Sequence, residues 1–360
     1  MSLSDLRVLG RTGVRVSPFV LGTMNFGRRG GTTHEDSVAL IHRALDAGIT
    51  VVDTADTYSR GESEIIVGKA LRERRDEVVL AGKFHNAVDD DPTHRGNSRR
   101  WIVRAVEDSL RRLGTDHLDL YQVHRPESVT ALEETVAALD DLVRAGKIRY
   151  YGTSVFSPGE LIEAQWIADR TKANRPATEQ VPYSPLIRGV ERETLPIARA
   201  YGLGVLTYGP LAAGWLSGGY RLGASQPSSH RAELIPGRFD IEAPANADKL
   251  AAADALAVLA EESGLTLIQL ALGFVLAHPD VTATIIGPRT GAHLDAYLGA
   301  ADITLTHDIL DRIDEIVPPG TVFAERDTGK IPDALADPAL RRRRPAEGPA
   351  AVLSGSAVDR

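Results

Sequence analysis

The chain has 360 residues, of which 43% are hydrophobic and 25% charged, a composition typical of globular proteins. Its formal net charge of −8 argues against nucleic acid as a partner, and the absence of cysteine excludes disulfides and thiolate chemistry. Because no apolar run reaches about 18 residues and no basic-then-apolar leader is present, we expect no membrane span, no signal peptide and a cytoplasmic location.

Residues 6–23 alternate apolar and polar positions around Gly10 and Gly13, which predicts a short β-hairpin followed by a first buried strand at 18–22. Further apolar runs predict strands at 48–54, 77–83, 117–123, 147–154, 177–180, 202–208 and 282–288. Amphipathic patterns predict helices at 35–47, 63–73, 98–112, 129–145, 158–170 and 191–201. Ser157 with Glu160 and Thr266 with Gln269 are spaced as capping boxes at helix starts.

The predicted strands are apolar on both faces, which is typical of a parallel sheet covered by helices. Eight strand–helix units follow one another without a gap, so the sequence favours an α/β fold of the closed (β/α)8 TIM barrel type. We expect this barrel over residues 1–325, with an N-terminal β-hairpin and a flexible C-terminal extension at 326–360. An open doubly wound sheet is the alternative.

Two regions interrupt the pattern. Residues 217–245 are rich in Gly, Pro and Ser and are too long for a simple connection, which indicates a functional lid. The second region is the extension itself, where Arg341–Arg344 predict a solvated, disordered tail; contact with phosphate or with a partner is the alternative.

Four titratable residues follow successive predicted strands. Asp53 and nearby Tyr58 come after one strand, Lys83 ends the next, and His124 follows the third. Each residue alone has an ordinary structural explanation, such as a cap, a packed aromatic or a surface lysine. Because the carboxyl ends of barrel strands meet at one face, we expect these four side chains to converge on one cleft.

The residue types suit proton donation. A phenol is a weak acid at neutral pH, and an ammonium beside it stabilises the phenolate. We therefore expect Lys83 to tune Tyr58 as a general acid, Asp53 to hold Lys83, and His124 to orient a substrate oxygen. No protein nucleophile is needed if a cofactor delivers hydride.

The chain resembles the aldo-keto reductase superfamily, and most closely the subgroup that contains potassium-channel β subunits and many bacterial reductases. The resemblance covers about residues 5–325 and rests on LGTMNFG (21–27), VDTADTYSRGESEIIVGKAL (52–71), LAGKFH (80–85), SLRRLGTDHLDLYQVHRP (109–126), GKIRYYGTS (146–154), EQVPYSPL (179–186), YGPLAAGWLSGGY (208–220) and IIGPR (285–289). It implies a (β/α)8 barrel, NADPH-linked reduction of aldehydes and ketones, and a catalytic tetrad on Asp53, Tyr58, Lys83 and His124.

The resemblance also implies a set of positions that bind NADPH. These are Gly22, Thr23, Met24, Asp53, Ser154, Gln180, Tyr208, Pro210, Leu211, Ala212, Gly214, Arg231, Gly287, Arg289 and His293. Among them Tyr208 would stack on the nicotinamide ring, and Gly287 and Arg289 would meet the adenosine 2′-phosphate.

The chain departs from the family pattern at several cofactor positions. Val155 follows Ser154, the serine that the resemblance places at the nicotinamide carboxamide, where relatives often have Asn or Arg. Gly219 stands where relatives have a lysine, and Arg221 is a possible substitute for it. His293 and Tyr297 stand where relatives have Gln and Asn. These departures leave the tetrad intact but leave open how strongly NADPH is preferred over NADH.

The expected substrate pocket is mostly apolar, which favours aromatic or medium-chain carbonyl compounds. The residues that we expect around it are Met24, Phe26, Phe84, Arg125 and Phe156.

Ten histidines are present but none has the spacing of metal ligands, so no metal site is expected. Two other functions stay open. One is an NADPH-binding barrel that turns over slowly and regulates a partner, and the other is a ketoreductase of a deoxysugar or secondary-metabolite pathway. A homo-oligomer is possible, and the sequence does not decide the oligomeric state.

Overall fold

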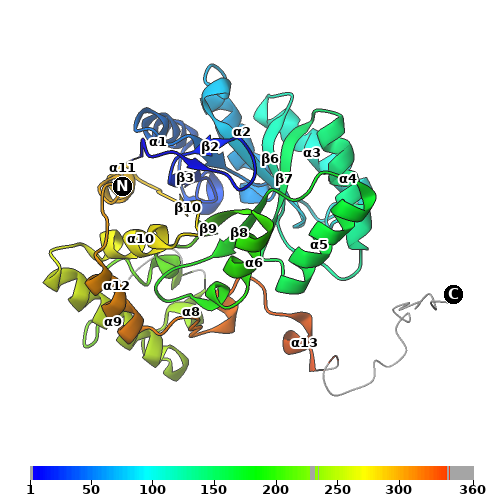
Figure 1. Ribbon diagram of the computed structural model, residues 1–360. Helices are drawn as coiled ribbons and strands as arrows, with labels where there is room; N and C mark the ends of the chain where they lie inside the picture. The colour runs from blue at the N-terminus through cyan, green and yellow to red at the C-terminus, as the bar shows by residue number, and fades with distance from the viewer. Residues whose placement is uncertain (1–2, 228–231, 234, 339, 341–360) are drawn as a thin grey trace.

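The computed structural model describes residues 3–227, 232–233, 235–338 and 340. Eight parallel strands form a closed barrel in the order β10-β3-β4-β5-β6-β7-β8-β9, which confirms the (β/α)8 prediction and excludes the doubly wound sheet (Figure 1). The barrel strands are β3 (Phe19–Gly22), β4 (Val51–Asp53), β5 (Val79–Phe84), β6 (Leu118–Val123), β7 (Ile148–Ser154), β8 (Thr178–Pro182), β9 (Gly204–Tyr208) and β10 (Ala283–Ile286). Pairing of β10 with both β9 and β3 closes the ring.

Helices surround the barrel and connect its strands (Figure 1). Those between consecutive strands from β3 to β9 are α1 (His34–Asp46), α2 (Glu62–Leu71), α3 (Arg99–Leu113), α4 (Leu132–Arg144), α5 (Pro158–Thr171) and α6 (Thr194–Tyr201). The later helices are α8 (Pro236–Phe239), α9 (Ala247–Glu262), α10 (Leu267–Ala277), α11 (Gly291–Leu298), α12 (His307–Ile316) and α13 (Asp333–Ala336). Both predicted capping boxes are present, at the starts of α5 and α10.

The predicted hairpin closes the amino-terminal end of the barrel. Its strands, β1 (Arg7–Val8) and β2 (Arg15–Val16), pair antiparallel and form a separate two-stranded sheet. Gly10, with φ +56°, approaches the starts of β8 and β9 so closely that a Cβ would lie 2.4 Å from the Gly204 amide nitrogen. Leu9 and Val16 complete the apolar cluster inside the barrel, so the opposite end is left for a functional site.

Within the described parts of the chain, no single helix is long and apolar enough to span a membrane. The segments Pro244–Glu262 and Leu267–Ala277 meet that criterion of length and composition only as a pair, bent by 97°. Both contribute apolar side chains to a second core cluster that also includes Trp215 and Tyr220.

Gly68 allows α2 to pack directly on the backbone of α3. A Cβ at this position would lie 2.4 Å from the carbonyl oxygen of Leu113. Alanine favours a helix over glycine by about 1 kcal/mol, but overpacking against backbone costs about 1–3 kcal/mol. We therefore expect Gly68→Ala to lower the free energy of unfolding by about 1–2 kcal/mol, measured by urea denaturation.

Gly159 provides the matched control. It lies in the first turn of α5, and a Cβ there would meet nothing within 4 Å. Gly159→Ala should leave stability unchanged or raise it by up to about 1 kcal/mol. Equal stabilities of the two variants would contradict the packing argument.

Candidate active site

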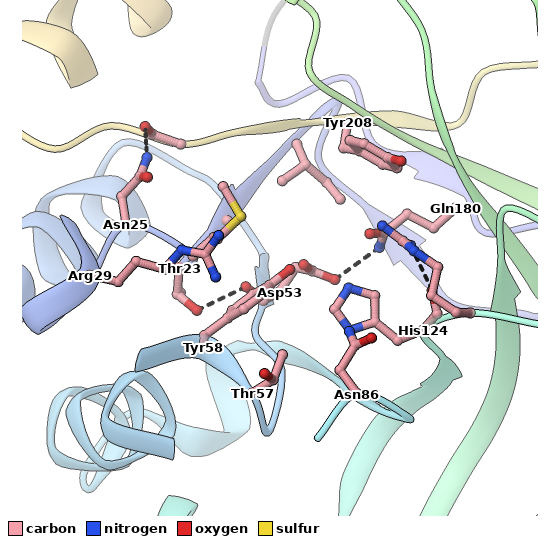
Figure 2. A pocket seen from close by; sticks show the side chains of 15 residues that line it. Thr23, Asn25, Arg29, Asp53, Thr57, Tyr58, Asn86, His124, Gln180 and Tyr208 are labelled. Atoms are coloured by element: carbon pink, nitrogen blue, oxygen red, sulfur yellow. Dashed lines mark hydrogen bonds between the residues drawn. The ribbon is translucent and has the colours of Figure 1, made fainter. Parts of the chain in front are cut away.

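A cavity of about 370 Å³ opens at the carboxyl-terminal end of the barrel, opposite the hairpin. Figure 2 shows the side chains that line it. Among the described residues that line it are Asp53, Tyr58 and His124 from the predicted tetrad. Lys83 lies directly beneath them and is fully buried. The structure therefore brings the four predicted side chains together at one face of the barrel.

Lys83 is the centre of the buried polar network. Its ammonium donates hydrogen bonds to a carboxylate oxygen of Asp53, to the Thr54 carbonyl at 2.8 Å and to the Tyr58 hydroxyl at 3.2 Å. Asp53 ends β4 and Lys83 is near the end of the neighbouring strand β5, so the pairing of these two strands places both groups together. Tyr58 begins a 3₁₀ turn just after β4.

The pKa values differ in part from the sequence-based expectation. Burial raises the pKa of Tyr58 above its ordinary value, and the opposing effect of Lys83 does not fully offset it. The phenol is therefore protonated at neutral pH, as a proton donor must be. Burial by itself would lower the pKa of Lys83, but Asp53 and Tyr58 outweigh it and the pKa is raised. The positive charge of Lys83 favours the phenolate form and so limits the rise in the pKa of Tyr58.

The Asp53 carboxylate has further partners on the opposite side from Lys83. Its Oδ2 accepts hydrogen bonds from the side-chain amides of Gln180 at 3.0 Å and Gln122 at 3.3 Å. Sequence reasoning missed Gln122, although a buried strand that carries a glutamine is itself a signal of a polar partner. These amides hold Asp53 in position and satisfy a charge that is almost completely buried.

His124 is neutral and has a defined tautomer. Burial, assisted by the positive charges of Lys83 and Arg125, holds its pKa well below the ordinary value. Its Nδ1 lies 3.1 Å from the Asn86 side-chain nitrogen, and because an amide nitrogen donates, this contact favours the tautomer with hydrogen on Nε2. The other ring nitrogen points toward the Tyr58 side of the cavity (Figure 2). Tyr58 and His124 thus present two hydrogen-bond donors to the same space.

About half of the predicted cofactor positions lie at this cavity. Gly22, Thr23, Met24, Asp53, Gln180, Tyr208 and Gly287 line the cavity. Ser154 is buried beside it, where its hydroxyl donates to the Gln180 carbonyl at 2.9 Å. Tyr208 and Gln180 therefore both border the cavity, where an aromatic ring fits stacking on a nicotinamide, whereas the Gln180 amide nitrogen already donates to Asp53 and Gln122.

The loop after β9 lies outside this cavity. It contains the predicted positions Pro210, Leu211, Ala212 and Gly214. The amides of Ala212 and Gly214 donate to carbonyls within the loop itself, and proline has no amide hydrogen. Of these four positions, Leu211 therefore offers the backbone amide on which the predicted binding of a pyrophosphate would rest, and that binding stays a prediction.

The predicted adenosine positions cluster at the start of α11. The Arg289 amide donates to the His293 ring at 3.4 Å, and Thr290 caps the helix by accepting from the His293 amide. Asn25, which sequence reasoning missed, donates to the Gly287 carbonyl at 2.9 Å. The predicted lid arginine, Arg231, lies outside the described residues.

The lining of the cavity is less apolar than the substrate pocket that we expected from the sequence. Met24 and Arg125 line the cavity, but Phe26 and Phe84 are fully buried in the outer core. Phe84 follows Lys83 on β5, and successive strand residues point to opposite faces, so a lysine that points inward places the phenylalanine outward. Its ring packs against Tyr121 with centroids 4.9 Å apart.

A tight bend after β7 turns Phe156 away from the cavity. Val155 has φ +51°, an unusual value for a β-branched residue, and Phe156 lines a second cavity of about 650 Å³. The buried carboxyl of Glu179 accepts from the Phe156 amide at 3.1 Å and from the Thr153 hydroxyl. Burial raises the pKa of Glu179 to about 8. This bend also sets the position of Ser154, the preceding residue.

The segment after α12 returns over the Tyr208 side of the site. Asp327 is buried and pairs with Lys249 of α9 and with Arg238 of α8, inside the predicted lid. A Cβ on Gly329 would lie 2.5 Å from the Tyr208 hydroxyl. The first residues of the expected C-terminal extension therefore pack on the barrel, whereas the lid motion, the boundary at 325 and a flexible tail stay predictions. Arg341–Arg344 lie outside the described residues.

Comparisons with known proteins identify a family for the chain. A family model described as "Aldo/keto reductase family" matches residues 18–318. The chain is 39% identical to "Uncharacterized oxidoreductase YrpG" of Bacillus subtilis, covering 91% of this chain and 98% of that protein. It is 36% identical to "Aldo-keto reductase YhdN" of Bacillus subtilis, covering 79% and 85%. It is 34% identical to a "Putative voltage-gated potassium channel subunit beta" of Schizosaccharomyces pombe, covering 86% and 92%.

The Asn86–His124 contact predicts the effect of a one-atom change. In Asn86→Asp the side chain can only accept, so the hydrogen of His124 should move to Nδ1 and the pKa of the ring should rise beside the new charge. ¹⁵N NMR of the imidazole over a pH series measures both changes. Asn86→Ala is the control, in which the ring should stay neutral; an Nε2–H tautomer in the Asp variant would contradict the assignment.

Proposed function

Because the chain belongs to the aldo/keto reductase family, we propose that it reduces an aldehyde or ketone to an alcohol with NADPH as hydride donor. The observation that carries this proposal is the hydrogen bond of 3.2 Å from the Lys83 ammonium to the Tyr58 hydroxyl at the floor of the cavity. The Tyr208 ring beside it fits stacking on a nicotinamide, and the polar side chains of Ser154 and Gln180 lie next to that position. When bound there, NADPH supplies a hydride to the carbonyl carbon.

The protein residues manage the carbonyl oxygen and its proton. Tyr58 and the Nε2–H of His124 donate hydrogen bonds to the oxygen, which orients the carbonyl and stabilises the negative charge that develops on it. The Tyr58 proton then moves to that oxygen and completes the alcohol. The phenolate left behind is stabilised by the Lys83 ammonium, which Asp53 keeps charged and in place. The proton balance is restored when the phenolate takes a proton from solvent.

Regulation of a partner with slow turnover is the competing function, since one relative is named as a potassium-channel β subunit. The complete set of Asp53, Tyr58, Lys83 and His124 favours the reductase, because binding a cofactor alone does not require an acid with a tuned proton. The cytoplasmic location also stays a proposal.

Removal of the Tyr58 hydroxyl tests the mechanism. We expect Tyr58→Phe to lower kcat for aldehyde reduction about 1000-fold, because general acid catalysis is lost, while the Kd for NADPH changes little. The measurements are the absorbance at 340 nm and a fluorescence titration of NADPH. Since burial raises the pKa of Tyr58, the wild-type rate should not decline between about pH 7 and 9. Near-normal turnover by Tyr58→Phe would refute the assignment.

Replacement of Arg289 tests the cofactor preference. If its guanidinium pairs with the 2′-phosphate, Arg289→Ala should weaken NADPH binding by about 10- to 100-fold and leave NADH binding almost unchanged. Arg15→Ala, on the hairpin at the other end of the barrel, is the control. An equal loss for both cofactors would exclude the phosphate contact.

A further inference from the structure

The outer faces of β7 and β8 carry a buried polar pair behind the cavity. The two strands pair so that Thr153 lies opposite Glu179 and Ser154 opposite Gln180. Because successive side chains of a strand alternate, the inward position of Gln180 places Glu179 and Thr153 on the outer face. Glu179 is fully buried there. It therefore lies outside the cavity but directly behind two of the predicted cofactor positions.

Glu179 holds both ends of the bend that follows β7, at residues 153–156. Its Oε1 accepts from the Phe156 amide at 3.1 Å, and its Oε2 is hydrogen bonded to the Thr153 hydroxyl. Between these two contacts the chain turns through Val155, whose φ of +51° is unfavourable for a β-branched residue. One carboxyl group thus bridges the residues before and after a strained position.

The middle of the bend is held by the backbone of Gln180. Its carbonyl accepts from the Ser154 hydroxyl at 2.9 Å and from the Val155 amide at 3.0 Å. Since the only hydroxyl hydrogen of Ser154 is used in this bond, its oxygen can only accept from a further partner. The N–H group of a nicotinamide carboxamide is such a donor, so the place of this acceptor depends on the bend.

The bend also packs against the C-terminal segment that covers Tyr208. A Cβ on Gly329 would lie 2.6 Å from Cγ1 of Val155 and 2.5 Å from the Tyr208 hydroxyl. In so close a packing, a shift of Val155 displaces the segment that contacts Tyr208. The bend is therefore coupled to both predicted nicotinamide contacts, Ser154 and Tyr208.

Glu179 has no cationic partner among the described residues. The titratable groups that act on it or respond to it are Glu160 at the start of α5 and Tyr208 of β9, and neither supplies a positive charge. The charged residues that line the cavity beyond Phe156 are Glu160, Arg192, Glu193, Glu325 and Lys330. Arg192 and Lys330 donate to the backbone carbonyls of Gly320 and Pro126.

A neutral acid suits this environment better than a carboxylate. A buried charge without a counter-charge is costly, and burial raises the pKa of Glu179 to about 8. As a carboxylate, Glu179 accepts the Thr153 hydrogen. As a neutral acid it donates to Thr153, whose own hydrogen is then free for the Thr178 carbonyl 3.4 Å away. Oε1 accepts from the Phe156 amide in both forms.

We propose that Glu179 is a positioning residue that fixes the bend at residues 153–156 and thereby the Ser154 oxygen that receives the nicotinamide carboxamide. The neutral acid is the form that does this, and loss of its proton loosens the bend. Glu179 itself touches neither cofactor nor substrate. This inference rests on the NADPH-linked function proposed above.

Substitution of Glu179 separates hydrogen bonding from charge. Glu179→Gln copies the neutral acid, because its amide keeps an oxygen for the Phe156 amide and an N–H for Thr153. Glu179→Ala removes both bonds. We expect the Kd for NADPH, from fluorescence titration, to stay within about twofold of wild type in the Gln variant and to rise about 10-fold in the Ala variant. Glu163→Ala, at an exposed glutamate of α5, is the matched control.

Thr153 tests the same bend from its other end and decides the question if Glu179→Ala does not fold. Valine has nearly the shape of threonine but lacks the hydroxyl, so Thr153→Val should raise the Kd for NADPH about three- to fivefold. Thr153→Ser keeps the hydroxyl and should retain most of the wild-type affinity.

The pH dependence is a readout that a merely structural role would not change. Because the raised pKa keeps Glu179 neutral below about pH 8, the wild-type Kd should rise about threefold between about pH 7 and 9.5, while that of Glu179→Gln stays flat. Without cofactor, the infrared spectrum at pH 7 should show the carbonyl band of a buried carboxylic acid. This band should disappear in alkaline solution and be absent from Glu179→Gln.

The outcomes distinguish this proposal from the proposed function. A Kd for Glu179→Gln as weak as that of Glu179→Ala, or a missing infrared band, overturns the role of the neutral acid. Unchanged affinity in both Glu179→Ala and Thr153→Val overturns the positioning role. If the wild type binds NADPH but reduces no aldehyde, the reductase function fails and the Kd series still decides the role of Glu179. If the wild type binds no NADPH, both proposals fail.

Discussion

The buried ion pair between Lys83 and Asp53 is the interaction on which the site depends. Removing two charges from water costs several kcal/mol per ion, so such a pair persists only when both groups are also hydrogen bonded. Here the Thr54 carbonyl accepts from Lys83, and the Gln122 and Gln180 amides donate to Asp53. The same contacts that stabilise the pair direct the ammonium toward Tyr58.

Barrel closure makes this arrangement possible. Neighbouring parallel strands place Asp53 and Lys83 side by side, and the hairpin seals the other end with Leu9 and Val16. Water and substrate can then reach the polar groups from one end only of the barrel interior. The alternation of side chains along each strand also decides the chemistry of the cavity, since inward Lys83 requires outward Phe84.

Tyr58 and His124 present two hydrogen-bond donors at the floor of the cavity. In the proposed reaction both groups act on the carbonyl oxygen, and the contact of His124 with Asn86 favours hydrogen on the ring nitrogen that faces the cavity. Arg29 and Arg125 line the same cavity.

The sequence by itself determined the barrel, its hairpin, both capping boxes and the convergence of Asp53, Tyr58, Lys83 and His124. These follow from local patterns and from the rule that parallel strands end at one face.

The tertiary structure decided the rest. Asn25, Arg29 and Asn86 come from loops whose course no periodicity predicts, and Gln122 is polar within an apolar strand. The phenylalanines were expected at the pocket from their position in the sequence, but the direction of a side chain depends on strand parity at Phe84 and on the left-handed bend at Val155 before Phe156. Burial is also visible only in three dimensions. It raises the pKa of Tyr58 and outweighs the opposite effect of Lys83.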